Sequence, residues 1–134
     1  MTTSSTFSLH EYPVHLGLGA SVVVQDRFTG DPDWYARYGE RNAADGVEGR
    51  LVTLHTFDTS WGSWEVHPLG DELVLCVEGA MTLHQEIDGQ VRSVLLRQGE
   101  AVINAPGMWH TADVDGTATA LFITAGTGTE VRPR

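Results

Sequence analysis

The chain has 134 residues and a formal net charge of -10, and its length suits one domain with a single core. The excess of acidic residues argues against nucleic acid or an anionic membrane surface as a partner, because both carry negative charge. All eight basic residues are arginines, so chemistry that needs a lysine ammonium group, such as a Schiff base or a P-loop, is excluded.

Cysteine content and the first residues bear on the compartment. The single cysteine, Cys76, allows no intrachain disulfide, which fits a reducing cytoplasm. Residues 1–8 show neither the basic nor the apolar region of a signal peptide. No apolar run approaches the length of a membrane span. We therefore expect a soluble cytoplasmic protein.

The first 49 residues predict an arm and one short helix. Residues 14–25 are apolar and partly β-branched, which is typical of an edge strand or an arm. Asp31 and Pro32 mark a helix start, with Asp31 as the N-cap and Pro32 at the first helical position. Trp34 and Tyr38 are four residues apart and would share a face. We expect this helix to lie against the rest of the fold.

Short predicted strands follow from residue 50 to about residue 125, and they include residues 72–77 and 80–87 as two separate strands. Asp88-Gly89 is a strong hairpin signal between two of the strands. Strands with turn signals at steady intervals indicate an all-β sandwich or barrel. Residues 126–134, rich in Gly, Thr, Pro and Arg, predict a flexible, exposed tail.

Three side chains able to bind a metal ion lie close together near the middle of the chain. Glu65 and His67 are two residues apart, so on a strand both leave the same face. A Pro-Leu-Gly-Asp turn follows, and Glu72 then opens an apolar strand. If Glu72 faces the same interior, one hairpin brings together two carboxylates and an imidazole. A later strand and Pro-Gly turn lead to another imidazole, His110.

These two stretches resemble the paired motifs of the cupins. The first cupin motif reads His-x-His, three or four residues, Glu, six residues, Gly. This chain has Glu65-x-His67, four residues, Glu72, six residues and Gly79. Glu65 therefore stands where the motif has its first histidine.

The second cupin motif is a Gly, a Pro-x-Gly turn and a His two residues further on. The chain has Gly99, Ala-Pro-Gly at residues 105–107, and His110 two residues later. Val114 stands where the family has an Asn. The resemblance implies a double-stranded β-helix, the cupin form of the jelly-roll barrel, with one short N-terminal helix. Its core would span about residues 50–125 within a single domain of residues 1–134.

The resemblance also implies that Glu65, His67, Glu72 and His110 are the ligands of one divalent metal ion. Two imidazoles and two carboxylates suit Fe(II), Mn(II), Ni(II) or Zn(II) by ligand hardness. The alternative is a metal-free barrel in which Glu65 hydrogen-bonds to His67 or pairs with an arginine. Two buried carboxylates close together repel each other, so without a cation at least one of them has a raised pKa. This favours the metal-bound barrel over the metal-free alternative.

The same alternation predicts a small-molecule pocket. Inward-facing Ser63, Val74 and Cys76 would form its floor, and Trp109, next to His110, would lie near its mouth. Cys76 could act as a nucleophile, but a lone cysteine in an apolar strand is more often a small buried hydrophobe.

Other histidines are interpreted as outside the site. His55 precedes the first motif on its own strand and is interpreted as a hydrogen-bonded wall residue. His10, His15 and His84 are interpreted as surface or arm residues.

Parity along the strand from Glu72 also predicts an apolar outer face. If Glu72 points inward, then Leu73, Leu75 and Val77 point outward. A strand that is apolar on both faces is covered on both. We therefore expect a homodimer.

Two classes of function remain open from the sequence. The first is a metal-dependent enzyme acting on a small organic molecule, such as a dioxygenase, an isomerase or a decarboxylase-like lyase. The second is a non-catalytic module that binds or senses a small molecule without a metal, because a fold does not fix a function.

Overall fold

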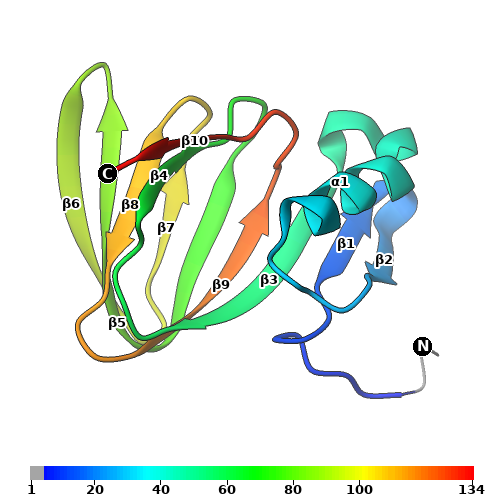
Figure 1. The fold of residues 1–134 in the computed structure, drawn as a ribbon, viewed down its shortest axis with the longest axis horizontal. Coiled ribbons are helices and arrows are strands. Elements are labelled where there is room, and N and C mark those ends of the chain that lie inside the picture. Colours follow the sequence, from blue (N-terminus) through cyan, green and yellow to red (C-terminus); the bar gives the residue numbers. More distant parts are fainter. Residues whose placement is uncertain (1–4) are drawn as a thin grey trace.

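The structure is a computed structural model that describes residues 5–134, and antiparallel strands make up most of it (Figure 1). The strands are β1 (Val14–Gly17), β2 (Ser21–Val24), β3 (Arg50–Phe57), β4 (Ser63–Val66), β5 (Glu72–Ile87), β6 (Gln90–Arg97), β7 (Ala101–Asn104), β8 (Trp109–Asp113), β9 (Ala118–Thr124) and β10 (Glu130–Pro133). The helices are α1 (Pro32–Arg41) and the short 3-10 segments η1 (Leu18–Ala20) and η2 (Ala43–Glu48). This is the predicted all-β jelly roll with one short α-helix.

Strand β5 joins the two halves of the fold. Its first half pairs with β7 and β9, and its second half pairs with β6 and β8. The pairing with β9 shifts register between Cys76 and Glu78, and such a bulge bends and twists a strand. The two strands predicted over residues 72–87 are therefore one continuous strand. The predicted Asp88-Gly89 hairpin is confirmed, since both residues have positive φ and Ile87 pairs with Gln90.

Helix α1 begins as predicted, with Asp31 at the N-cap position and Pro32 in the first turn. The buried Trp34 ring stacks on Tyr38 with centroids 5.7 Å apart and meets the edge of Phe28 at 5.0 Å. The helix lies beside β1, β2 and β3, at the opposite end of the molecule from β6 (Figure 1). Aromatic packing therefore fixes the helix against one end of the strands.

Residues 126–134, predicted as a flexible, exposed tail, are mostly exposed, but residues Glu130–Pro133 form a strand. Strand β10 pairs antiparallel with β4, with Val131 opposite Glu65. The guanidinium of Arg132 lies over the rings of Trp64 and Trp109, at 5.2 and 4.5 Å from their centroids. Composition alone missed this strand because its partner lies far away in the sequence.

The core fills the interior between the two halves. Its buried members are Val74, Cys76, Met81, Leu83, Leu96, Ala112, Val114, Ala118, Ala120 and Phe122. None of the helices within residues 5–134 is long and apolar enough to cross a membrane.

Gly79, the glycine that closes the first motif, has a backbone that tolerates no side chain. Its φ is 78°, in the left-handed region. A Cβ placed there would lie 2.3 Å from the backbone oxygen of Thr117. Gly116 has a similar φ of 84° but open space around it. Comparing the two positions therefore distinguishes the cost of backbone strain from the cost of a steric clash.

Replacing Gly79 with alanine should therefore destabilise the fold more than the same change at Gly116. We expect Gly116→Ala to cost about 1 kcal/mol of unfolding free energy from backbone strain. Gly79→Ala should cost a further ~1–3 kcal/mol, because the backbone must move to relieve the overlap. Urea denaturation of the two variants beside the unaltered protein measures the difference, and equal losses would contradict the expectation.

The outer face of β5 is apolar, as parity predicts. Leu73 and Leu75 are half-buried, and Val77 is 40% exposed. Leu73 pairs across the sheet with Ile103 of β7, which is 58% exposed, and with Ile123 of β9. These side chains form a continuous apolar stripe across three strands.

The homodimer stays a prediction, and this stripe is where it can be tested. We expect light scattering at micromolar concentration to give about twice the chain mass of 14.6 kDa. Ile103→Glu should shift the mass toward the monomer by placing a charge in the stripe. Val91→Glu alters an exposed valine on β6 and serves as the control. A monomeric unaltered protein would refute the dimer.

Candidate metal centre

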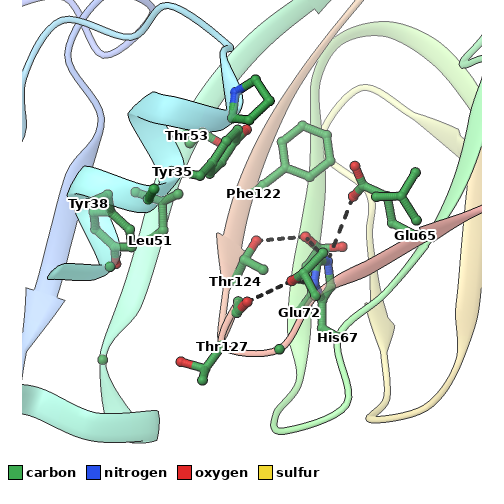
Figure 2. A pocket seen from close by; sticks show the side chains of 18 of the residues that line it. Tyr35, Tyr38, Leu51, Thr53, Glu65, His67, Glu72, Phe122, Thr124 and Thr127 are labelled. Carbon is green, nitrogen blue, oxygen red and sulfur yellow. Dashed lines mark hydrogen bonds and ion pairs between the residues drawn. The ribbon is translucent and has the colours of Figure 1, made fainter. Parts of the chain in front are cut away.

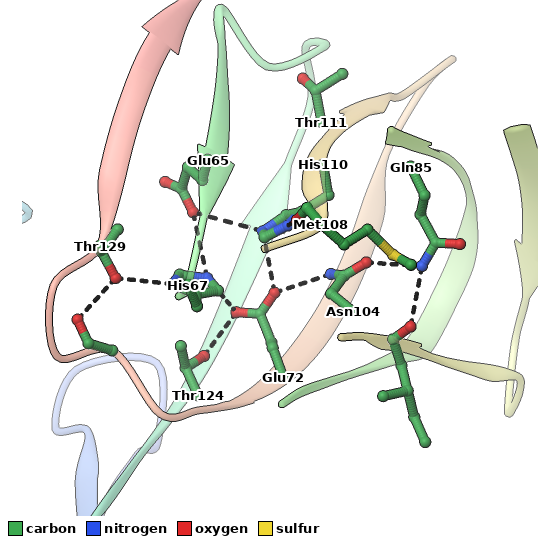
Figure 3. Close-up of polar contacts among 12 residues, drawn as sticks. Glu65, His67, Glu72, Gln85, Asn104, Met108, His110, Thr111, Thr124 and Thr129 are labelled. Carbon is green, nitrogen blue, oxygen red and sulfur yellow. Dashed lines mark hydrogen bonds and ion pairs between the residues drawn. The ribbon is translucent and has the colours of Figure 1, made fainter. Parts of the chain in front are cut away.

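All four predicted ligands converge at one point. Glu65 on β4 pairs directly with His110 on β8. His67 lies just after β4, and the turn that follows delivers Glu72 at the first position of β5. His67, Glu72 and His110 are buried, and Glu65 is half-buried. Two sequence-distant hairpins therefore present two imidazoles and two carboxylates to each other (Figure 3).

The distances fit a shared centre. His67 Nε2 lies 3.2 Å from Glu72 Oε2, and His110 Nε2 lies 3.2 Å from Glu72 Oε1. Both Nε2 atoms lie 3.9 Å from Glu65 Oε2. Glu65, His67 and His110 each offer a ligand atom within 4.8 Å of the others and could hold a metal ion.

Hydrogen bonding fixes the tautomer of His67. Its Nδ1 lies 2.7 Å from Thr129 Oγ1, and the Thr129 hydroxyl donates to the carbonyl of Gly126 at 2.7 Å. A hydroxyl has one proton to donate, so the ring Nδ1–H must donate to the Thr129 oxygen. In the neutral ring, the lone pair is therefore on Nε2, which faces the carboxylates.

His110 is oriented in the same way. Its Nδ1 lies 3.2 Å from the carbonyl oxygen of Met108, which can only accept a hydrogen bond. Its Nε2, like that of His67, is buried and has no hydrogen-bond partner within residues 5–134. Two imidazole lone pairs therefore point at Glu72, an arrangement that needs a positive charge between them.

Glu72 is held rigidly from behind. Its Oε1 accepts a hydrogen bond from Asn104 Nδ2 at 3.0 Å, and its Oε2 accepts one from Thr124 Oγ1 at 2.6 Å. Gln85 Nε2 donates to Asn104 Oδ1 at 2.7 Å, and Arg92 Nε donates to Gln85 Oε1 at 2.9 Å. This relay of hydrogen bonds, from Arg92 through Gln85 and Asn104, holds the Glu72 carboxylate in place. The sequence offered no signal for Asn104, Gln85 or Thr124 as site residues.

The pKa values of Glu72, Glu65 and His110 are shifted by burial and by their closeness to one another. Burial alone would raise the pKa of Glu72, but the nearby rings of His110 and His67 outweigh burial and hold it below its usual value. Burial and the nearby charge of Glu72 raise the pKa of Glu65. Burial would lower the pKa of His110, but Glu72 outweighs it and raises that pKa. The protein without an ion therefore favours extra positive charge at this point.

Similarity to known proteins is confined to the fold. No protein-family model and no curated protein matches the chain. Among solved structures, recombinant oxalate oxidase in complex with glycolate matches with a TM-score of 0.53 and 16% identity. That match covers 60% of this chain and 45% of the oxalate oxidase chain.

Two further structures are similar. Hydroxypropylphosphonic acid epoxidase from S. wedmorenis in complex with fosfomycin matches with a TM-score of 0.50 and 14% identity, over 56% of this chain and 43% of that one. A cupin-2 domain containing protein from Shewanella frigidimarina matches with a TM-score of 0.47 and 19% identity, over 63% of this chain and 71% of that one. The chain has the cupin fold. It spans less than half the length of the oxidase and epoxidase chains.

A cavity of about 1190 Å³ opens beside the centre of this fold. Glu65, His67 and Glu72 line one side, and Ser63 lines it as predicted. Figure 2 shows Phe122 of β9 and Tyr35 between the carboxylates and Leu51 of β3. The cavity therefore extends from the candidate ligands toward the helix.

Three predicted pocket residues lie elsewhere. Val74 and Cys76 do point inward, but both are fully buried in the packed core and do not line the cavity. Trp109 leaves the opposite face of β8 from His110 and stacks beneath Arg132. Strand alternation explains this, because neighbours in a strand face opposite sides.

The remaining histidines differ in their surroundings. His55 is a half-buried wall residue that packs against Phe28 at 4.9 Å and Phe122 at 6.0 Å. His15, interpreted as a surface or arm residue, lies on β1 in the arm and is not at the surface. It is 3% exposed and bridges Tyr38 Oη at 2.7 Å and Asp45 Oδ2 at 2.6 Å. The segment around η2 buries it, which the local sequence does not reveal.

The relay behind Glu72 generates a stability prediction. Asn104→Ala should cost about 1–3 kcal/mol of unfolding free energy, because Glu72 Oε1 and Gln85 Nε2 would each lose a buried partner. Gln90→Ala, at an exposed hairpin position, is the control and should be within about 0.5 kcal/mol of the unaltered protein. Urea denaturation measures both, and a neutral Asn104→Ala would show that the relay does not hold the carboxylate.

Proposed function

We propose that this cupin binds one divalent metal ion through Glu65, His67 and His110, with Glu72 as a further ligand, and acts as a metal-dependent enzyme on a small organic molecule in the cavity. The observation that carries the proposal is the paired Nε2 atoms. Both are buried and lack a hydrogen-bond partner within the described residues 5–134, and both lie 3.2 Å from one carboxylate. Ligands bonded to one ion at about 2.1 Å are roughly 3 Å apart when adjacent, which matches this spacing.

The types of ligand atom limit the candidate metals and the candidate classes of reaction. Nitrogen and oxygen ligands without sulfur favour Fe(II), Mn(II), Ni(II) or Zn(II). Glu65, His67 and His110 by themselves are two histidines and one carboxylate, a set that with open positions is typical of non-haem Fe(II) oxygenases. If Glu72 is held mainly by its hydrogen bonds to Asn104 and Thr124, dioxygenase chemistry is favoured over an isomerase or lyase reaction. The similar folds of an oxalate oxidase and an epoxidase support an oxidising role. A bound ion would supply a Lewis acid and open positions for substrate.

The carboxylates have different roles in this proposal. Both oxygens of Glu72 already accept hydrogen bonds, so Glu72 positions the centre and is a poor proton carrier. Glu65 lines the cavity, its side chain is 39% exposed, and its pKa is raised by burial and by Glu72. Glu65 can therefore accept a proton from a cavity-bound molecule when the ion does not hold it tightly.

Binding of a small molecule without a metal is the second candidate. Glu65 Oε2 lies 3.9 Å from both imidazoles, a spacing that ion pairs with protonated histidines would also give. In this case the site would be a charged pocket wall with no catalytic ion.

Metal analysis distinguishes the two candidates. Protein purified without chelator should retain close to one equivalent of a divalent metal. His67→Ala, His110→Ala and Glu65→Gln should each lower the affinity at least about tenfold. The two alanine changes remove a ligand nitrogen, and the glutamine change replaces a charged carboxylate with a neutral, weaker amide oxygen. His84→Ala removes a histidine whose ring bonds to Ser93 and Asp113 away from the centre, so it should retain the metal.

Circular dichroism should show that His67→Ala stays folded, because the core does not include the imidazole. The metal proposal fails if the unaltered protein retains no metal and added Fe(II), Mn(II), Ni(II) or Zn(II) leaves its melting temperature unchanged. Binding of a metal to the folded state alone must raise that temperature.

A further inference from the structure

The wall of the cavity away from the metal centre is aromatic. Among the rings that line it are those of Phe28, Tyr35, Tyr38, His55, Phe57, Trp61 and Phe122. They pack edge-on or tilted against one another, with Phe57 and Trp61 at 5.5 Å and Trp61 and Phe122 at 5.9 Å. Tyr35 stays 47% exposed, so a bound ring would cover it. Such a wall offers flat apolar contact area.

No arginine lines this cavity among the residues that the structure describes, and the chain contains no lysine. His15 is paired with Asp45 at 2.6 Å. Burial lowers the pKa of His55, with the charge of His10 adding to the effect, so its ring is neutral at pH 7. Tyr35 and Tyr38 also line the cavity, and burial raises the pKa of each, so they are neutral at pH 7. The charged side chains left are Glu65 and Glu72 beside His67, at the metal end. On the aromatic wall, away from the metal centre, an anionic group would find no cationic side chain to neutralise it.

We propose that the cavity selects a neutral, flat aromatic molecule carrying a hydroxyl or carbonyl oxygen, and rejects small organic anions. The ring would lie against Tyr35, Phe57 and Phe122, and the oxygen would point toward Glu65 and the histidines. A buried charge without a partner is costly, and a net charge of -10 also repels anions. The cavity volume of about 1190 Å³ leaves room for a two-ring ligand.

One polar group on this wall supports an oxygen-bearing ligand. The indole N–H of Trp61 is buried and has no hydrogen-bond partner within residues 5–134. A buried donor left unpaired costs free energy that an acceptor would recover. An oxygen on a ligand near Trp61 could supply that acceptor after a small adjustment of the wall.

The orientation of the ligand rests on the metal centre proposed above, but the preference for neutral rings rests on the wall. Binding is therefore measured on both the metal-loaded and the metal-free protein. If neither imidazole binds a metal yet the preference for neutral rings persists, the proposed function fails and this inference stands. If the metal binds but the preference is absent, this inference fails and the metal centre stands.

Three matched probes separate charge from flatness. They are 2-naphthol, which is neutral at pH 7, 2-naphthoate, which has the same rings and a negative charge, and decahydro-2-naphthol, which has the same skeleton without aromatic rings. Titration calorimetry should show 2-naphthol binding at least about tenfold more tightly than either of the others, with or without metal. Equal or tighter binding of 2-naphthoate or decahydro-2-naphthol in the metal-free protein would overturn the inference.

A charge placed on the wall should reverse the preference. Tyr35→Arg adds a cation at an exposed cavity position, so 2-naphthoate should bind more tightly and 2-naphthol more weakly. The ratio of the two affinities should change by at least about tenfold, because a nearby opposite charge is worth more than 1.4 kcal/mol in a partly buried site. Val91→Arg adds the same charge at an exposed position on β6, outside the cavity, and should leave the ratio unchanged. A change of both affinities in the same direction with Tyr35→Arg would indicate a structural effect and overturn the inference.

Discussion

The buried carboxylate of Glu72 is the constraint on which the site depends. It is 3% exposed, and water cannot solvate its charge. Asn104 and Thr124 satisfy it from one side by hydrogen bonds, and two imidazoles face it from the other. Because the Nδ1 atoms of both rings are bound elsewhere, the ring lone pairs meet the carboxylate. The site is stable only with added positive charge, from protons or from a metal ion.

This constraint is also built into the fold. Glu72 is the first residue of the long strand β5, which pairs with four other strands and links both halves of the jelly roll. The second imidazole, His110, is fixed on β8, and its pairing with Glu65 aligns it with β4. Shifting any of these strands by one residue would turn its ligand outward. The strand register that encloses the hydrophobic core therefore also brings the four candidate ligands together.

The sequence predicted the part of this site that follows from short-range regularities. Alternation within one hairpin placed Glu65 and His67 on one face with Glu72 close by, and the resemblance to the two cupin motifs implied that His110 joins them. The supporting residues were missed because their partners are distant: Thr129 meets His67 across 62 positions, and Asn104 meets Glu72 across 32. A threonine or asparagine in a strand carries no mark of such a contact until the strands are paired.

Alternation says which way a side chain points, but it does not say whether space lies in front of it. Val74 and Cys76 point inward as expected, yet both are fully buried in a core cluster that also contains Phe122 and Met81. The interior is therefore divided: one end is filled by aliphatic side chains, and the other is left open between the carboxylates and helix α1. Phe57, Trp61 and Phe122 belong to both, since they pack on the core and line the cavity. Their inner faces stabilise the fold while their outer faces shape the ligand site, so ligand preference can be altered most safely at Tyr35, which contacts the cavity from the helix and is not part of the core.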